Sequence, residues 1–310
     1  MLTKALQIGL VGLGKIARDQ HLPAIAATTG ARLTAIASRN ATMAGVNNYQ
    51  TLAQMLDAQP ALDAIILCQP PEARFEAAQL AIAAGKHVFL EKPPGATVSE
   101  VETLVGSAKQ HGVTLFTSWH SRFGAAVPVA KTWVAEHEIT SVEILWKEDI
   151  RHWHPGQDWI LQPGGFGVFD PGINALSILT EIMPEPVRLV EATLRMPSNR
   201  QAPITADLEM KTASGVPISV AFDFLQTGPQ LWDIVIEAGN ESLRLAHGGN
   251  KLWINGTARN VGSEAEYPSM YRHFVDLIRA GKSDVDVTPL QLVADAFLRG
   301  RMIATDPFDF

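Results

Sequence analysis

The sequence predicts an α/β protein of two domains, a doubly wound parallel sheet followed by an α+β domain with a mostly antiparallel sheet. Three observations support this prediction. The 310 residues exceed what one hydrophobic core usually organises. As far as about Phe123, short apolar runs alternate with amphipathic helical stretches, and beyond it long segments of alternating polarity appear. We therefore expect domains of residues 1–123 and 124–310.

The first domain contains five apolar runs, each short enough for a buried parallel strand. They are Gln7–Val11, Arg32–Ala37, Ala64–Leu67, His87–Leu90 and Thr114–Thr117. Helical patterns occur between them at Tyr49–Leu56 and Arg74–Ala84. The capping-box spacing of Thr97 and Glu100 predicts a further helix that runs to about Gln110. Strand and helix in repetition indicate a parallel sheet with helices on both faces.

The second domain contains six segments in which apolar and polar residues alternate, as in half-buried antiparallel strands. They are Ser141–Lys147, Val187–Arg195, Ala206–Lys211, Val216–Phe224, Trp232–Ala238 and Ser242–Ala246. Thr212–Gly215 predicts a hairpin turn. Gly167–Met183 and Tyr267–Ala280 have helical spacing and are expected to pack on one face of this sheet. A last helix is expected at about Thr288–Met302.

The composition excludes several classes of protein. With 46% hydrophobic and 18% charged residues, the chain is globular rather than disordered. A net charge of −7 disfavours nucleic-acid and anionic-membrane partners but permits a local anion pocket. The single cysteine, Cys68, excludes an intramolecular disulfide. Since neither a signal-peptide pattern nor an apolar run of ~20 residues occurs, we expect a cytoplasmic protein without a membrane partner.

A glycine motif, Gly12-Leu-Gly14-Lys15-Ile16-Ala17, follows the first apolar run where a strand gives way to a helix. Gly12 permits a tight turn, Gly14 lets the backbone approach a pyrophosphate, and Ala17 allows close helix–strand packing. Amides at the helix start, where Lys15 and Ile16 lie, face the phosphate charge. The motif therefore predicts a dinucleotide site in a Rossmann-type domain. The alternative is a glycine-rich turn that binds nothing.

Ser38 and Arg39 follow the second apolar run, where an NAD enzyme usually carries an acid for the adenosine ribose. An acid would repel a 2′-phosphate, whereas a hydroxyl and a guanidinium could bind it. We therefore expect NADP or NAD as cofactor, with NADP binding at least as well. A solvated loop arginine is the alternative interpretation.

Glu91-Lys92-Pro93, together with the glycine motif and Asp170-Pro-Gly-Ile-Asn174, resembles the glucose–fructose oxidoreductase/inositol dehydrogenase family over essentially the full length. Four further segments are similar to its bacterial L-arabinose/D-galactose 1-dehydrogenase branch: Gly14–Pro23, Trp146–Asp149, Arg151–Gly156 and Phe169–Ser177. The resemblance implies a Rossmann domain followed by a domain with a large open sheet. In this family the exposed sheet face commonly forms an oligomer interface, which implies a homodimer through the C-terminal sheet.

Oxidation of a sugar at C1 requires a hydride acceptor, a proton acceptor and groups that hold the ring. Lys92 lies at the carboxyl end of a predicted parallel strand, where it could polarise the reacting oxygen, with Glu91 expected beside the cofactor. Most of the family has a histidine where this chain has Asn174, whose amide positions a hydroxyl but does not titrate. Asp170, one helical turn earlier on the same face, is then the expected base. Two alternatives remain, His120 as the base and Asp170 as a helix N-cap.

Polar and aromatic residues of the second domain are expected to bind the sugar. Trp153 could stack on a pyranose face, while His154, Glu148 and Asp149 could hydrogen-bond its hydroxyls. Trp232 could complete the aromatic wall, although a core position is equally compatible with its strand.

Two histidines, His152 and His154, share a face in extended structure. They lack a convincing third ligand, so no metal is expected. His120, which follows the last strand of the first domain, is expected to contact the substrate. A buried structural histidine is the alternative.

Together with these residues, the resemblance implies NAD(P)-dependent oxidation of an aldopyranose, L-arabinose or D-galactose, at C1 to the aldonolactone. One alternative is oxidation of a ring hydroxyl in a related sugar or inositol. Another is a regulatory protein that binds dinucleotide without turnover, because a fold alone carries no activity.

Overall fold

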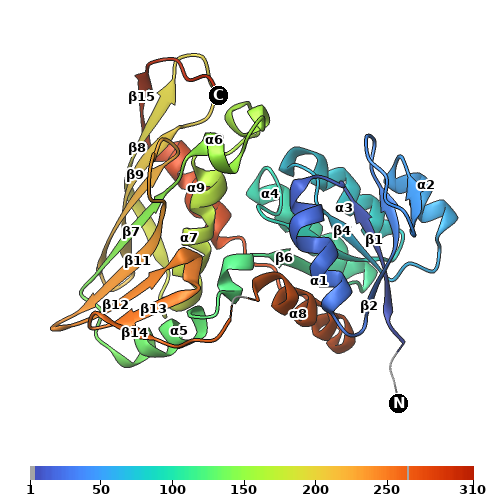
Figure 1. Ribbon diagram of the computed structural model, residues 1–310, viewed down its shortest axis with the longest axis horizontal. Coiled ribbons are helices and arrows are strands. Elements are labelled where there is room, and N and C mark those ends of the chain that lie inside the picture. Colours follow the sequence, from blue (N-terminus) through green and yellow to red (C-terminus); the bar gives the residue numbers. More distant parts are fainter. Residues whose placement is uncertain (1–3, 264) are drawn as a thin grey trace. The chain divides into compact units, whose positions relative to one another are not determined.

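The computed structural model describes residues 4–263 and 265–310, which form two compact units (Figure 1). The first unit runs as far as His120 and also includes Glu266–Val287. The second comprises Ser121–Ala265 and Thr288–Phe310. This division differs from the expected one, because residues 266–287 return to the first unit instead of staying in a domain of residues 124–310.

The first unit is built on a six-stranded parallel sheet with the strand order β3-β2-β1-β4-β5-β6. Its strands are β1 (Leu6–Val11), β2 (Ala31–Ala37), β3 (Asn47–Tyr49), β4 (Ala64–Leu67), β5 (His87–Glu91) and β6 (Leu115–Ser118). The chain moves outward from β1 to β3, then returns beside β1 and continues to β6. The order therefore reverses between β1 and β4, and open α/β sheets bind ligands at the carboxyl ends of strands beside such a reversal.

Helices cover this sheet. They are η1 (Ala17–His21), α1 (Leu22–Ala27), α2 (Leu52–Ala58), η2 (Pro71–Ala73), α3 (Arg74–Ala83), α4 (Val98–His111) and α8 (Glu266–Ala280), while η3 (His120–Phe123) begins at the last residue of the unit's first segment. One core cluster joins α2, α3 and α4 to the strands through fully buried residues such as Met55, Ala81 and Leu104. Helix α8 packs against α1.

Helix α8 corrects one expectation, because it packs in the first unit and not on the sheet of the second. The Tyr271 ring stacks on Phe89 of β5 with ring centroids 5.1 Å apart, and the Phe274 ring lies edge-on to Phe89 at 5.4 Å. All three side chains are fully buried. An amphipathic pattern identifies the apolar face of a helix but does not name the core that this face covers.

The second unit is built on a nine-stranded sheet with the order β14-β13-β12-β11-β7-β10-β9-β8-β15. Its strands are β7 (Ser141–Lys147), β8 (Val187–Pro197), β9 (Thr205–Thr212), β10 (Pro217–Asp223), β11 (Leu231–Ala238), β12 (Glu241–Ala246), β13 (Lys251–Ile254), β14 (Thr257–Arg259) and β15 (Arg301–Thr305). Most neighbours are antiparallel, as predicted, but the pairs β7–β10 and β8–β15 are parallel.

One face of this sheet is covered by α5 (Val127–Glu136), α7 (Phe169–Ile182) and α9 (Thr288–Arg299) (Figure 1). A Cβ on Gly172 of α7 would lie 2.7 Å from the ring of Phe222 on β10, so glycine allows α7 to approach the sheet closely. The remaining helical segments are α6 (Ile150–Trp153), η4 (Asp158–Leu161) and η5 (His247–Gly249).

Several elements differ from the sequence prediction. The sequence does not predict β3, β13, β14 or β15. Tyr49 ends β3 instead of opening a helix, and α2 starts at Leu52 after Thr51, whose side chain accepts from the Gln54 amide. The last helix ends at Arg299, because the chain continues after Gly300 into β15 instead of completing the expected helix to Met302.

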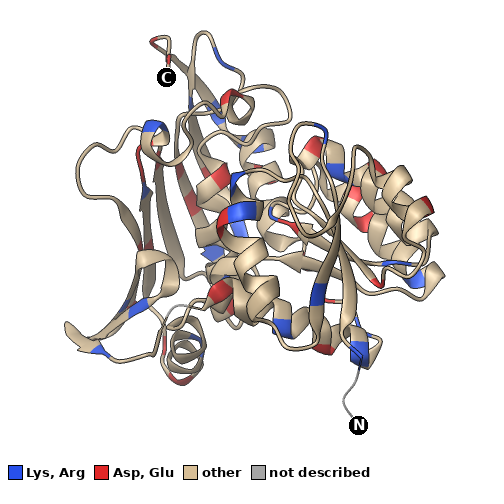
Figure 2. Cartoon of the chain, turned by 45° about the vertical axis from the view of Figure 1, so that its right-hand side comes forward, with Lys and Arg blue, Asp and Glu red and all other residues tan. Residues whose placement is uncertain are grey.

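Basic and acidic residues are interspersed along both units (Figure 2), in keeping with the modest net charge of −7. Within residues 4–263 and 265–310, no helix has the length and apolar character needed to cross a membrane.

Candidate functional site

The glycine motif lies at the carboxyl end of β1. Gly12 has a φ of +92°, and a Cβ there would lie 3.1 Å from the carbonyl carbon of Cys68, just beyond β4. Both conditions require glycine. At Gly14, in contrast, a Cβ would meet no atom within 4 Å, so the space beside this backbone is open to a ligand.

The helical segment after the motif begins at Lys15 and Ile16 and continues through the π-helical turn η1 into α1. Such turns are rare and often occur at functional sites. Free amides at a helix start attract phosphate. The open side of Gly14 and this helix start therefore fit the pyrophosphate of a dinucleotide.

Ser38 and Arg39 lie directly after β2, the strand that pairs with β1 in the sheet. The Ser38 amide donates to the carbonyl of Tyr49 at 2.9 Å, which fixes the backbone where the chain leaves the strand. Ser38 is half-buried and Arg39 is exposed. Both positions are compatible with the predicted contact to an adenosine ribose.

Glu91, the last residue of β5, lies at the centre of a buried hydrogen-bond network. Its Oε1 accepts from the Tyr267 hydroxyl at 2.7 Å and lies 3.3 Å from His21 Nε2. Its Oε2 accepts from Ser118 Oγ at 3.0 Å and from the backbone amide of Lys92. The side chain, expected beside the cofactor, thus has both oxygens engaged by the protein and fixes the start of the Lys92 backbone.

Charges in this network shift two pKa values in opposite directions. Burial alone would raise the pKa of Glu91, but the hydrogen bond and charge of His21 hold it well below its usual range. The charges of His120 and Arg74 act in the same direction. Burial also disfavours protonated His21, but the Cys68 sulfur and the Glu91 carboxylate outweigh it and raise the pKa of His21 to about 10. At neutral pH the pair is therefore an imidazolium and a carboxylate.

Two tyrosines of α8 complete this network. Tyr267 bonds to Glu91, and the Tyr271 hydroxyl lies 2.7 Å from His21 Nδ1. Burial, followed by nearby negative groups, raises the pKa of both phenols, which therefore stay neutral. The two tyrosine hydroxyls of α8 thus serve as hydrogen-bond partners for the buried Glu91 and His21 side chains.

Arg74 at the start of α3 holds the backbone on the other side of Lys92. Its guanidinium donates to the carbonyls of Glu91 and Pro93 and lies 3.5 Å from the carbonyl of Lys92. Arg74 is only 3% exposed, and the Lys92–Pro93 peptide is cis. Two buried charged side chains therefore fix the backbone on both sides of the predicted catalytic lysine.

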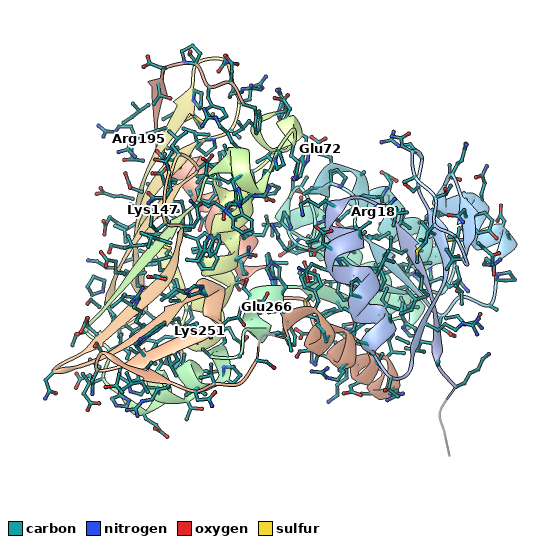
Figure 3. The ribbon with its side chains drawn as sticks, in the orientation of Figure 1. Arg18, Glu72, Lys147, Arg195, Lys251 and Glu266 are labelled. Carbon is teal, nitrogen blue, oxygen red and sulfur yellow. The ribbon has the colours of Figure 1, made fainter. Side chains whose placement is uncertain are left out.

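His120 follows β6 and pairs with a residue that the sequence does not single out. Its Nδ1 lies 2.6 Å from Oε2 of Glu266, which is labelled at the start of α8 in Figure 3. The imidazole also stacks on the Tyr267 ring at 5.4 Å. A carboxylate that contacts one ring nitrogen fixes the orientation of the imidazole.

In the second unit, Glu148 connects two of the predicted sugar-binding residues. It follows β7 and is 5% exposed. Its Oε1 lies 3.1 Å from His154 Nε2, and its Oε2 accepts from the indole N–H of Trp232 at 2.8 Å. Trp153 meets the Trp232 ring edge-to-face at 5.1 Å and is 41% exposed. The result is an accessible aromatic surface supported by a buried carboxylate.

Asp149 acts as a helix cap. Its Oδ1 accepts from the Arg151 amide at 2.9 Å at the start of α6, and its own amide donates to Gln230 Oε1 at 2.6 Å. A contact from Asp149 to a sugar hydroxyl stays a prediction.

Asp170 and Asn174 lie one turn apart on α7 and share a helix face. Asp170 is 5% exposed and lies in the first turn, whereas the N-cap position is occupied by Val168. Asn174 is 8% exposed, and its Oδ1 is buried without a hydrogen-bond partner in the described part of the chain. Because buried polar atoms are nearly always bonded, this oxygen is suited to accept from a ligand hydroxyl.

The predicted site residues thus fall into two groups. Gly12, Gly14, Lys15, Ile16, Ser38, Arg39, Glu91, Lys92 and His120 belong to the first unit, and Glu148, Asp149, Trp153, His154, Asp170, Asn174 and Trp232 to the second. Among the residues that the structure describes, no group of three or more His, Cys, Asp or Glu side chains is placed to hold a metal ion.

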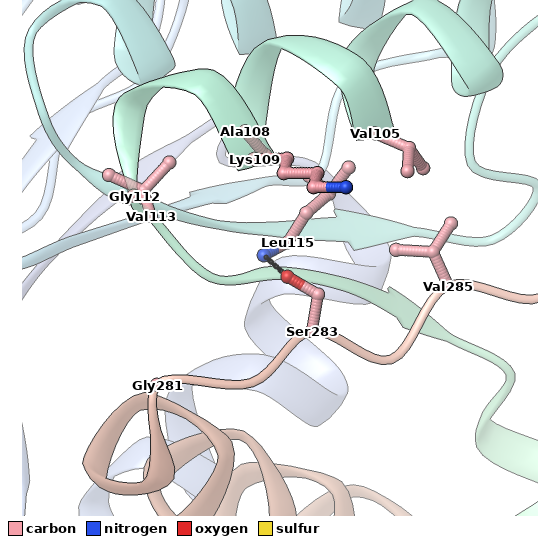
Figure 4. A pocket seen from close by; sticks show the side chains of 9 residues that line it. All are labelled: Val105, Ala108, Lys109, Gly112, Val113, Leu115, Gly281, Ser283 and Val285. Atoms are coloured by element: carbon pink, nitrogen blue, oxygen red, sulfur yellow. Dashed lines mark hydrogen bonds between the residues drawn. The ribbon is translucent and has the colours of Figure 1, made fainter.

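A pocket of about 400 Å³ lies elsewhere in the first unit, between α4, β6 and the loop after α8 (Figure 4). Its lining includes one charged residue, Lys109, among Val105, Ala108, Gly112, Val113, Leu115, Gly281, Ser283 and Val285. It contains none of the predicted site residues, so we do not assign the reaction to it.

A parallel sheet in this strand order with a glycine motif at its reversal defines a dinucleotide-binding class of protein. Comparison with known proteins identifies the family. Residues 6–118 match the model of the oxidoreductase family with an NAD-binding Rossmann fold. The chain is 45% identical over 303 residues to a galactose 1-dehydrogenase from Pseudomonas fluorescens, covering 98% of each chain. The chain belongs to this oxidoreductase family, the glucose–fructose oxidoreductase/inositol dehydrogenase family that its motifs predict.

Solved structures agree with this assignment. The crystal structure of a D-galactose-1-dehydrogenase from Rhizobium etli matches with a TM-score of 0.96 at 54% identity, covering 99% of both chains. KijD10, a 3-ketoreductase from Actinomadura kijaniata solved with NADP and TDP-benzene, matches with a TM-score of 0.84 at 19% identity, covering 97% of this chain and 100% of that one. The second likeness concerns the fold alone.

Proposed function

We propose that this enzyme oxidises D-galactose and L-arabinose at C1 to the aldonolactone, with NAD or NADP as hydride acceptor. The observation that carries this proposal is the full-length similarity to two galactose 1-dehydrogenases, at 45% and 54% identity. The aligned region spans both units, in which the two groups of predicted site residues lie.

In this proposal the first unit binds the dinucleotide, which accepts the hydride from C1. Gly12 and Gly14 hold the pyrophosphate at the start of the helical segment, with the backbone of Lys15 and Ile16. Ser38 and Arg39 contact the adenosine ribose, and the Arg39 guanidinium makes NADP bind at least as well as NAD.

Lys92 and Asp170 carry the proton chemistry. The Lys92 ammonium stabilises negative charge on the C1 oxygen, and Asn174 positions a sugar hydroxyl. The C1 hydroxyl gives its proton to the Asp170 carboxylate while the electron pair of the C1–H bond leaves with the hydride, so that a carbonyl forms at C1. His120 is the alternative base, because its contact with Glu266 holds the imidazole in a fixed orientation.

The aromatic surface of Trp153 and Trp232 takes the apolar face of the pyranose ring. His154 and Glu148 contact ring hydroxyls and orient each other. Asp149 adds a further acceptor in the same segment. A cytoplasmic location and a homodimer through the nine-stranded sheet complete the proposal, and both stay predictions.

Steady-state kinetics with D-galactose, L-arabinose and D-glucose, each with NAD and with NADP, test the proposed function. Galactose and arabinose should give comparable kcat/KM, because these pyranoses differ only in the C5 hydroxymethyl group. Glucose, the C4 epimer of galactose, misplaces one hydroxyl and leaves buried polar groups without partners. We expect its kcat/KM to be ~10²-fold lower, which corresponds to ~2.7 kcal/mol.

Comparable kcat/KM for glucose and galactose would mean that C4 is not recognised. Turnover of an inositol or amino sugar without turnover of any aldose would indicate ring-hydroxyl oxidation instead. Dinucleotide binding without a change in nicotinamide absorbance for any sugar would indicate a regulatory protein.

A further inference from the structure

Residues Asp306–Phe310, which follow β15, lie along the second unit as a strap, called here the C-terminal strap. Phe308 is its buried residue, with 6% exposure. The Phe308 amide donates to Asn199 Oδ1 at 2.9 Å, and its carbonyl accepts from Asn199 Nδ2 at 3.2 Å and Arg200 Nε at 2.9 Å. With the bond from Asn199 Nδ2 to Asp309 Oδ1 at 3.1 Å, four hydrogen bonds therefore tie the strap to the turn after β8.

The same strap contacts the segment 150–161, which contains Trp153 and His154. The Arg151 guanidinium lies over the Phe308 ring, with Cζ 4.6 Å from the centroid, and donates to the Asp309 carbonyl at 3.3 Å. Arg200, which holds the Phe308 carbonyl, also pairs with Asp158 of η4. The strap is thus connected to the beginning of this segment directly and to its later part through Arg200.

Helix α6, at the start of this segment, has little intrinsic stability. It has four residues, and so short a helix does not persist by its own hydrogen bonds. Ile150 is buried, but Arg151, His152 and Trp153 are exposed. Its order therefore depends on contacts from outside, which include the Asp149 cap and the strap.

We propose that the C-terminal strap positions Trp153 and His154 for sugar binding, with Phe308 as the anchor and Arg151 as the connection. This inference rests on the proposed function. A segment that is already ordered binds its ligand without the entropic cost of ordering it. Without the strap, sugar binding itself has to order the segment, so the affinity for sugar is lower. Dinucleotide affinity should not change, because the predicted dinucleotide residues belong to the first unit.

Phe308→Ala and Arg151→Gln test the proposal, with Arg195→Gln as the matched control. The Arg195 guanidinium on β8 pairs with Asp207 of β9 at 2.6 Å, and not with the strap or with segment 150–161. We expect the two test variants to raise the KM for D-galactose about tenfold, with a smaller change in kcat and an unchanged Kd for dinucleotide. The control should stay within about twofold of wild type. Because Arg151 is exposed, its variant carries the test if Phe308→Ala fails to fold.

Hydrogen exchange provides a readout that needs no sugar. The amides of His152, Trp153 and His154 donate to the carbonyls of Asp149 and Ile150 at 2.9–3.1 Å. In both test variants these amides should exchange about tenfold faster, while those of α7 should not change. If the wild-type protein oxidises no sugar, the proposed function is wrong. Hydrogen exchange in the variants still shows whether the strap orders the segment. Unchanged exchange overturns the strap's role, and faster exchange with an unchanged KM overturns its connection to sugar binding.

Discussion

At the scale of a single residue, the backbone of Lys92, the predicted catalytic residue, is fixed on both sides by Glu91 and Arg74. We predict that Lys92→Met nearly abolishes turnover, because methionine keeps the length of the side chain but removes the ammonium. Dinucleotide affinity should stay within about tenfold of wild type. Steady-state kinetics and a fluorescence titration of the reduced dinucleotide measure the two quantities.

Lys86→Met is the matched control for this prediction, because Lys86 is a half-buried lysine of the same unit whose ammonium donates to the Pro60 carbonyl. Its kcat should equal that of wild type. Asp170→Asn should lose turnover as Lys92→Met does, whereas His120→Asn should mainly raise the KM for sugar. If His120→Asn loses turnover and Asp170→Asn retains it, His120 is the base and Asp170 contacts the sugar.

Arg39 carries the prediction on cofactor choice. Arg39→Ala should weaken NADP binding by ~1.5–3 kcal/mol and leave NAD binding nearly unchanged, because only NADP offers a 2′-phosphate to the guanidinium. Calorimetric titration with each dinucleotide measures this difference. Arg32→Ala, at an exposed position on β2, is the control and should affect neither cofactor. Equal losses for the two cofactors in Arg39→Ala would refute the contact.

Sequence patterns identify residues whose role depends on local backbone, and miss those that act across long separations. Gly12 is predictable because its positive φ belongs to a turn of adjacent residues. The network around Glu91 is not, since Tyr267 reaches it from 176 residues away. Glu148 and Trp232 are both singled out by their chemistry, but their direct hydrogen bond follows from the pairing of β11 with β7, which no local pattern encodes.

At the scale of secondary-structure elements, the Glu91 network joins β5, η1, β6 and α8. Glu91→Gln should lower the free energy of unfolding by ~3–5 kcal/mol, because it leaves the buried His21 imidazolium without its carboxylate. Urea unfolding at neutral pH measures the loss. Glu72→Gln, an exposed acid on η2 labelled in Figure 3, is the control and should change stability little.

The same pair predicts a pH dependence of stability. The raised pKa of His21 gives a contribution that is complete below its ordinary value of 6.5 and is lost as pH rises toward about 10. The lowered pKa of Glu91 gives a contribution that is complete above its ordinary value of 4.5 and is lost at lower pH. The His21–Glu91 pair therefore stabilises the fold most between pH 4.5 and pH 6.5. Unfolding measured from pH 2 to 10 should show both slopes reduced in Glu91→Gln, and parallel curves for variant and wild type would contradict this.

Element types are predicted better than their partners. The alternation in β7, β9 and β10 is read correctly because each strand has one buried face. The end of α9 is read incorrectly, since the apolar residues of Arg301–Thr305 continue the helical spacing although they form an edge strand beside β8. For α8 the sequence predicts the helix correctly but assigns it to the wrong core, because its apolar face is compatible with either unit. Only the contacts of Tyr271 and Phe274 with Phe89 show that it packs in the first unit.

At the scale of the whole molecule, the open face of the nine-stranded sheet carries the prediction of a homodimer. On the central strand β7, Leu145 points away from the helices, because Ile144 and Trp146 beside it are buried beneath them. Its register partner on β10 is Ala221. We predict that Leu145→Glu converts a dimer of twice 33.6 kDa into a monomer, because it adds a negative charge to that face beside Asp233, its register partner on β11.

Sedimentation velocity measures the mass of each variant. Leu298→Glu on α9, where the side chain is 83% exposed, is the control and should stay dimeric. A monomeric wild type contradicts the prediction, and a dimeric Leu145→Glu variant moves the interface to another surface.

The interrupted course of the first unit has a consequence for its synthesis on the ribosome. Helix α8 begins 266 − 120 = 146 residues after the unit's first segment ends. At ~5–20 residues per second, the nascent sheet waits roughly 7–30 s before Tyr267 and Tyr271 are made. During that interval Phe89 lacks its covering helix and Glu91 lacks one of its donors. The dinucleotide-binding unit, although encoded first, is therefore completed only after most of the second unit has been translated.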